Sequence, residues 1–137
     1  MLVVCAPDAF KHSMSSRQAA DAMARGVRQA GHDAVVCPVA DGGEGTADVL
    51  HAALGGIMHV SETVDPVHRL MSGSWLELPD GTALIETATA SGLPLLSAAD
   101  RDPLRATSTG TGMLIAAAIE AGVDRVLIGV GGTATVD

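Results

Sequence analysis

Aromatic and basic side chains are scarce in this 137-residue sequence, which has one Trp, one Phe and no Tyr. A core must therefore be built from aliphatic residues, Met and Ala, without the large area that each aromatic ring buries. Proteins that bind single-stranded nucleic acid stack bases on aromatic side chains, so this class is disfavoured. There are 8 Lys and Arg against 16 Asp and Glu, giving a formal charge of −8. Because Lys and Arg supply most of the affinity for phosphate backbones, we expect no nucleic-acid partner.

Long apolar runs and targeting signals are lacking too. No stretch approaches the roughly 18 apolar residues of a membrane span, and the first residues lack the basic leader of a signal peptide. Cys5 and Cys37 have no CxxC partner, so we interpret both as buried structural thiols. The sequence therefore predicts a soluble, cytoplasmic protein that does not bind a membrane.

The order of apolar and polar segments predicts an α/β fold. Short apolar runs at 2–5 and 34–39 are typical of buried strands, and helical segments follow them at about 15–30 and 47–54. Strands alternating with helices at this spacing indicate a parallel sheet with crossover helices. Beyond about residue 57 the pattern changes. Strands are expected at 57–64, 70–78 and 82–87, with a hairpin-type turn at 79–81 that favours antiparallel pairing. Residues 88–103 look irregular, and a helix to about 121 and a strand at 125–130 follow.

Charged side chains follow the two predicted strands of the first half. Asp8 and Lys11 come after the first strand, and Asp41 and Glu44 come after the second. Loops at the carboxyl ends of parallel strands form the binding edge of an open α/β sheet. A Lys there could neutralise a transferring phosphoryl group, and Asp8 could act as a base or a metal ligand. The alternative for each is an ordinary surface residue.

The segment Asp-Gly-Gly-Glu-Gly-Thr at 41–46 is the most distinctive turn. Its carboxylates, Asp41 and Glu44, flank Gly42 and Gly43 before a predicted helix, whose N-terminus favours anions. The glycines would let the backbone approach a ligand, and the carboxylates could orient Mg²⁺ or accept a proton. The alternative is a glycine turn with helix-capping acids.

Two further segments are rich in hydroxyls and glycine. Residues 107–112 open a predicted helix and suit an anion, although they lack the Walker A pattern. In the segment 129–137, the apolar strand at 125–130 runs into two glycines, two Thr and Asp137, as the start of a phosphate-binding corner does. Glu86 ends a strand and is a weaker candidate for the same cleft. The candidate substrate or phosphate ligands of the two segments are Ser108, Thr109, Gly110, Thr111, Gly131, Gly132, Thr133 and Thr135.

Taken together, these segments resemble the bacterial glycerate kinase family, the type that phosphorylates D-glycerate. The resemblance covers essentially the whole chain, and the order and spacing of its short motifs make it specific. The matching segments are 6–11, 38–46, 86–93, 101–104, 107–112 and 129–137. At the end of the chain, Thr133 stands where Ser is common and Val136 where a polar residue is common.

The resemblance implies a two-domain α/β enzyme that uses ATP and Mg²⁺ to make a phosphoglycerate, usually the 2-phosphate. It implies that residues 1–60 are the first segment of a Rossmann-like domain. Residues 61–137 would be the first segment of a second, inserted α/β domain with antiparallel strands. The sequence would then correspond to about the first third of a family member, with both domains incomplete. We expect the 137-residue chain alone to be inactive.

The resemblance also suggests roles for the candidate residues. Asp8 or Asp41 would accept or orient the proton of a glycerate hydroxyl, and Lys11 would neutralise phosphoryl or carboxylate charge. Mg²⁺ would be held by Asp41, Glu44 or Asp137, directly or through water. The alternatives are a catalytically inert truncated fragment and a small-acid binding module. A homo-oligomer, or a complementing chain that covers an exposed core, is a further expectation.

Overall fold

The computed structural model describes residues 1–10 and 13–137, which form two compact units, Met1–Asp41 and Gly42–Asp137. The α/β prediction is confirmed, because one unit contains a parallel sheet and the other a mixed sheet. The division follows Asp41, whereas the sequence predicts a domain boundary near residue 60. The assignment of 1–60 and 61–137 to two domains stays a prediction.

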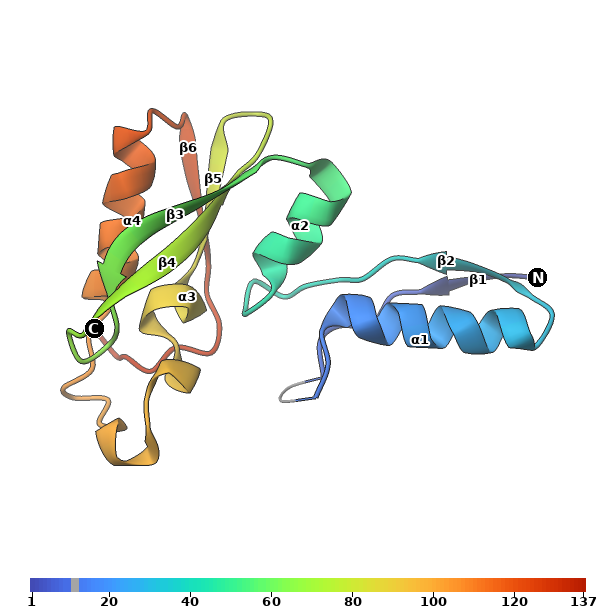
Figure 1. Cartoon of the computed structure of the whole chain (residues 1–137), viewed down its shortest axis with the longest axis horizontal. Coiled ribbons are helices and arrows are strands. Elements are labelled where there is room, and N and C mark those ends of the chain that lie inside the picture. Colours follow the sequence, from blue (N-terminus) through green and yellow to red (C-terminus); the bar gives the residue numbers. More distant parts are fainter. Residues whose placement is uncertain (11–12) are drawn as a thin grey trace. The chain divides into compact units, whose positions relative to one another are not determined.

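The first unit is a strand–helix–strand motif. Strands β1 (Leu2–Cys5) and β2 (Asp33–Val36) pair in parallel, and helix α1 (Ser16–Gln29) connects them and lies alongside both (Figure 1). The helix begins where the sequence predicts, because Ser15 and Gln18 form a capping box. The hydroxyl of Ser15 accepts from the Gln18 N–H, and the Gln18 side chain accepts from the Ser15 N–H.

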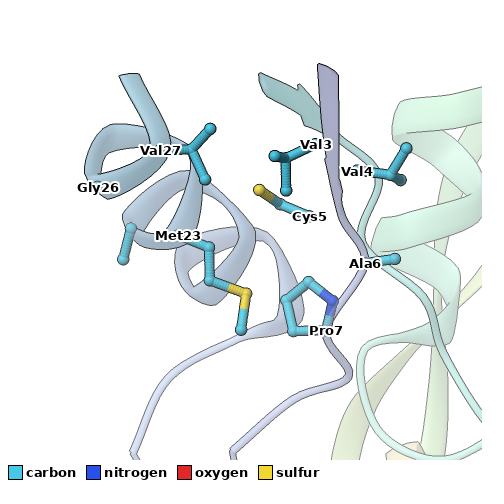
Figure 2. A pocket seen from close by; sticks show the side chains of 9 residues that line it. Val3, Val4, Cys5, Ala6, Pro7, Met23, Gly26 and Val27 are labelled. Carbon is cyan, nitrogen blue, oxygen red and sulfur yellow. The ribbon is translucent and has the colours of Figure 1, made fainter. Parts of the chain in front are cut away.

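The buried core of the first unit consists of small side chains, namely Cys5, Ala19, Ala20 and Ala24. Cys37, predicted to be buried, is exposed, because it continues the alternation of β2 on the same face as Asp33 and Val35, which are exposed too. A shallow apolar hollow lies between β1 and α1 (Figure 2). Its lining residues are Val3, Val4, Cys5, Ala6, Pro7, Ala22, Met23, Gly26 and Val27. None of them carries a charge, so the hollow does not suit an organic acid or a phosphate.

The second unit is built on a four-stranded sheet in the order β3-β4-β5-β6 (Figure 1). Its strands are β3 (Ile57–Val64), β4 (Leu70–Glu77), β5 (Thr82–Glu86) and β6 (Arg125–Gly129). The pairs β3–β4 and β4–β5 are antiparallel, whereas β5–β6 is parallel. The predicted change from parallel to antiparallel pairing is therefore confirmed, and the last strand joins the second sheet.

Strand β5 is buried along its whole length, because helices contact both of its faces. Ala83 and Ile85 pack with Leu114 and Ala118 of helix α4 (Thr109–Glu120). Alternate residues of a strand point to opposite faces. Glu86 therefore points to the other face, where helix α2 (Thr46–Leu54) contacts the strand.

The segment 88–103, predicted to be irregular, contains short helices. Helix α3 (Thr87–Ser91) follows β5 directly, and the 3₁₀ turns η1 (Leu93–Leu95) and η2 (Ala98–Asp100) follow it. The composition of α3, only Thr, Ala and Ser, gives no apolar period, and of its residues Ala90 reaches the core cluster. None of the helices in the described part of the chain is both long and apolar enough to cross a membrane.

Candidate functional site

Three segments meet in the second unit: the turn Gly42–Thr46, Glu86 at the end of β5, and the backbone from Gly129 to Gly131. Gly129 is paired with Glu86 in the β5–β6 ladder. A Cβ atom at Gly129 would lie 2.5 Å from the carbonyl oxygen of Gly42, and one at Gly131 would lie 2.8 Å from the Cα of Gly43. The two glycine-rich segments singled out in the sequence thus pack backbone against backbone, and glycine is what permits this approach.

The turn is closed by the side chain of Thr46. Its hydroxyl donates to the carbonyl of Gly43 at 2.8 Å and accepts from the N–H of Gly42 at 3.1 Å. Gly45, the residue before α2, has φ of +93°, in the left-handed region that favours glycine. A glycine has no side chain with which to cap the helix, so the first N–H groups of α2 need an acceptor from elsewhere.

Glu86 supplies that acceptor from β5. One carboxylate oxygen accepts from the N–H of Gly45 at 3.2 Å, and the other accepts from the N–H of Ala47 at 2.5 Å. Glu86 is only 7% exposed. Burial raises the pKa of its carboxyl group, an effect opposed by the two N–H bonds and reinforced by the negative charges of Asp48 and Glu44.

The closing segment, residues 129–137, begins where Gly129 and Gly131 contact the turn and continues to the start of helix α4. The N–H of Gly131 lies 3.4 Å from the hydroxyl of Thr87, and the N–H of Ala134 donates to the carbonyl of Ser91 at 2.9 Å. Gly92 and Thr133 form an isolated antiparallel bridge. The closing segment is therefore fixed along the β5–α3 connection.

Asp137 then binds the start of α4. Its carboxylate accepts from the N–H of Ser108 at 2.9 Å and from the hydroxyl of Thr107 at 3.1 Å. These bonds, the Ser108 N–H first, lower the pKa of Asp137 below its ordinary value. Ser108 is the N-cap residue of α4 and makes no side-chain cap of its own. The starts of α2 and α4 are thus each bound by a carboxylate from a distant part of the chain.

The structure brings many of the predicted site residues into two groups. One group combines Gly42, Gly43 and Gly131 at the turn, and the other combines Ser108 with Asp137 at α4. Glu44 and Thr109 are exposed, whereas Gly110 and Thr111 are buried. Gly132 and Thr133 are exposed and Thr135 is half-buried.

The remaining candidates lie elsewhere. Asp8 and Asp41 are exposed residues of the first unit, and Asp8 accepts from the N–H of Ala9 at 2.7 Å. Lys11 lies outside the described residues. Within 1–10 and 13–137, no three His, Cys, Asp or Glu side chains gather as a metal site would require. The carboxylate of Asp137 in particular accepts hydrogen bonds from Thr107 and Ser108 at the start of α4.

The contacts of Glu86 with the turn were not anticipated from the sequence, where Glu86 is only a weak candidate. Its partners, Gly45 and Ala47, lie about forty residues earlier in the chain. Two signals could have indicated the contact: a carboxylate at the end of a buried strand, and a helix preceded by glycine with no local cap.

Comparison with known proteins gives a consistent result along the chain. Residues 3–137 match the model of the glycerate kinase family. The chain is 46% identical to the glycerate 2-kinase of Escherichia coli K12 and 44% identical to the glycerate kinase of Bacillus subtilis 168, in both cases over its whole length. A solved structure from Salmonella typhimurium LT2, assigned as glycerate kinase 2, superimposes with a TM-score of 0.78 at 40% identity over 98% of the chain.

The 137 residues span 37% of the length of each of these three proteins. The family match nevertheless covers all but the first two residues. The chain belongs to the glycerate kinase family.

Proposed function

We propose that the complete protein carrying these residues transfers the γ-phosphoryl group of ATP to a hydroxyl of D-glycerate in the cytoplasm, giving 2-phosphoglycerate. One structural observation supports a phosphoryl-transfer site here. The Gly42–Thr46 turn and the Gly129–Gly131 backbone, far apart in sequence, pack closely against each other beside the end of a buried strand. The choice of product follows the name of the Escherichia coli relative.

The proposed chemistry needs a proton acceptor and compensation of negative charge. Asp8 or Asp41 would take or orient the proton of the attacking glycerate hydroxyl. Lys11 would neutralise charge on the γ-phosphoryl group or on the glycerate carboxylate. The backbone N–H groups of the turn and of the closing segment would orient these anions, with Gly42, Gly43, Glu44, Gly131, Gly132, Thr133 and Thr135 contributing.

The start of α4 would bind a second anionic group. Ser108, Thr109, Gly110 and Thr111 lie there, and hydroxyls and free N–H groups at a helix start suit phosphate or carboxylate. Because the carboxylate of Asp137 binds the Ser108 N–H, an incoming anion would have to displace it. Ligand binding at this end of the site would therefore move Asp137.

Phosphoryl transfer from ATP ordinarily uses Mg²⁺, which would neutralise the charge that develops on the phosphoryl group. Asp41, Glu44 and Asp137 are the proposed ligands. The described residues do not gather three such side chains in one place. The fit is therefore poor within this part of the protein, and no step is assigned to a metal here.

A second candidate is an inert fragment that needs a partner chain or a further segment to complete its core. The observation in its favour is the exposure of apolar side chains on β1 and β6. Leu2 is 64% exposed and Leu127 50% exposed, where strands of α/β proteins are normally covered. A homo-oligomer or a complementing chain could cover them.

The test of the proposed function is turnover by the complete protein with D-glycerate and Mg·ATP, with the product identified by ³¹P NMR. We expect a phosphomonoester signal at the 2-position that depends on both substrates. Calorimetry on the 137-residue chain with each substrate distinguishes the second candidate. If the complete protein forms no phosphoglycerate, the proposed function is wrong; if the short chain binds neither ligand, it is an inert fragment.

A further inference from the structure

Glu86 is the acidic residue that connects the sheet to the candidate site. The helix that follows the glycine turn has no local cap, since its N-cap residue is Gly45. The carboxylate of Glu86 reaches this helix from the end of β5 and binds the N–H groups of Gly45 and Ala47, one with each oxygen. These two hydrogen bonds thus connect the turn to a strand that is buried along its whole length.

We propose that Glu86 is a positioning residue: its carboxylate holds the Gly42–Thr46 turn in its working conformation by accepting the N–H groups of Gly45 and Ala47. This inference rests on the proposed function, because it concerns the geometry of that same site. Glu86 is not assigned a contact with substrate. It acts through the turn, in which Gly42 and Gly43 face the closing segment.

The sheet geometry makes the contact specific. Glu86 is the last residue of β5, and its side chain shares a face with Leu84, on the side of α2. Its neighbour in the ladder is Gly129, which itself approaches the carbonyl of Gly42. A shift of the Glu86 carboxylate would therefore displace both the Gly42–Thr46 turn and the Gly129–Gly131 backbone that packs against it.

Burying a carboxylate is costly, which argues that the contact is not incidental. Glu86 is 7% exposed, and two backbone N–H bonds offset the cost of its burial. The charged groups facing it are Glu44 in the turn and Asp48 on α2, and both are negative. On the other sides, β6 brings Gly129 and α3 begins with Thr87, and neither is charged. The N–H groups of Gly45 and Ala47 are therefore what stabilises the ionised carboxylate.

An ionised carboxylate accepts both N–H bonds at full strength. Protonation turns one oxygen into an O–H donor and weakens the bond that this oxygen accepts. Burial nevertheless outweighs the two bonds and raises the pKa of Glu86, so the closed turn binds a proton more readily than an exposed glutamate does. Acidification should therefore not loosen the turn in the wild type, and any effect of pH through residue 86 should be absent when that residue cannot titrate.

The experiment compares wild type with Glu86→Gln, which keeps the size of the side chain but can accept only one of the two bonds. Amide hydrogen exchange of Gly45 and Ala47 is measured across acidic and neutral pH in the complete protein, together with kcat and KM for D-glycerate. At neutral pH we expect exchange of at least one of these amides to be about tenfold faster in the variant, and kcat to be about tenfold lower, from the loss of a charge-assisted bond. As the pH falls, the wild type should keep its greater protection of these two amides relative to the variant.

Asp65→Asn is the matched control. Asp65 is also buried, at 6% exposure, and accepts two backbone N–H bonds, from Val67 and Arg69, in the turn between β3 and β4. Because both bonds end on Oδ1, which asparagine retains, this substitution removes a buried charge without removing an acceptor, and the exchange of Gly45 and Ala47 should be unchanged. Circular dichroism checks that both variants fold, and Glu86→Asp serves as a second variant that keeps the charge but is one methylene shorter.

The positioning role is overturned if both Glu86 variants keep the exchange of Gly45 and Ala47 within twofold of wild type, or if kcat stays unchanged while exchange accelerates. Failure of the proposed function gives a different result. The wild type would then not phosphorylate D-glycerate at all, while the exchange data would still show whether Glu86 holds the turn.

Discussion

At the scale of single residues, the candidate site depends on the absence of side chains as much as on their presence. Gly129 and Gly131 lie where a Cβ atom would meet the backbone of Gly42 and Gly43. Because backbone cannot move aside as a flexible side chain can, even the smallest substitution must separate the two segments. The carboxylate of Glu86 holds the other side of the turn.

Gly129→Ala tests this close approach. The new Cβ would lie 2.5 Å from the carbonyl oxygen of Gly42. We expect a loss of about 1–3 kcal/mol in the free energy of unfolding, as overpacking typically costs, and a fall in kcat because the turn is displaced. Denaturant unfolding and initial rates measure the two effects.

Gly112→Ala is the control for that substitution. Gly112 lies in α4, and outside the backbone of its own helix no heavy atom of the described residues comes within 4 Å of the position that a Cβ would take. Alanine should be neutral or stabilise by about 0.5–1 kcal/mol, because it favours a helix over glycine. If Gly129→Ala behaved like Gly112→Ala, the contact between the two glycine segments would be refuted.

At the level of elements, both helices that open in the candidate site lack a side-chain cap from their own N-cap residue and are bound by a carboxylate from elsewhere. The start of α2 is bound by Glu86 of β5, and the start of α4 is bound by Asp137 at the end of the closing segment. Helix α1 differs, since Ser15 and Gln18 cap it locally. Both helix starts are proposed to lie near substrate anions. At α4 an incoming anion would displace Asp137, whereas at α2 Glu86 would keep its bonds to the turn.

The contact of Asp137 predicts a pH dependence at α4. The pKa of Asp137 is lowered, so its stabilising contribution is present above the ordinary aspartate range and is lost as the pH falls through its pKa in the folded protein. The amide proton shift of Ser108, followed by NMR, should titrate with a midpoint below that of an ordinary aspartate. In Asp137→Ala this titration should vanish.

Glu120→Ala provides the comparison for Asp137→Ala. It removes a negative charge from the opposite end of the same helix, where an acid is unfavourable. The Ser108 titration should persist in this variant. A Ser108 shift that titrates equally in Asp137→Ala would show that another group is responsible.

The sequence was most informative where a periodic pattern or a cap signal was strong. The strands at 2–5, 57–64 and 70–77, and the capping box of α1, were predicted closely. Helix α3 was missed, because five small residues carry no apolar period and the helix is held in place by its neighbours. The contact of Glu86 with α2 was missed because it depends on the register of a sheet, which local patterns do not encode.

At the scale of the whole molecule, the two compact units differ in how they are stabilised. The second unit has a continuous cluster around Trp75, Ile85 and Leu114 between the sheet and its helices. The buried apolar side chains of the first unit, Met1–Asp41, are Cys5 and small alanines. A segment of this size with so small a core is at the lower limit of independent stability.

The two groups of site residues lie at opposite ends of the closing segment within the second unit, whereas Asp8 and Asp41 belong to the first. The family is established for the chain, which spans 37% of the length of its Escherichia coli relative. The proposed reaction therefore belongs to the complete protein.

We propose that the turn after Asp41 is part of the site at which D-glycerate is phosphorylated. The most direct test is the D-glycerate-dependent rate of ADP formation by the complete protein, compared between wild type, Asp41→Asn and Lys11→Ala at saturating substrates. We expect a rate that requires D-glycerate in the wild type and falls by about two orders of magnitude or more in both variants, because a general base or charge stabilisation is removed. Near-normal turnover in both variants would contradict it.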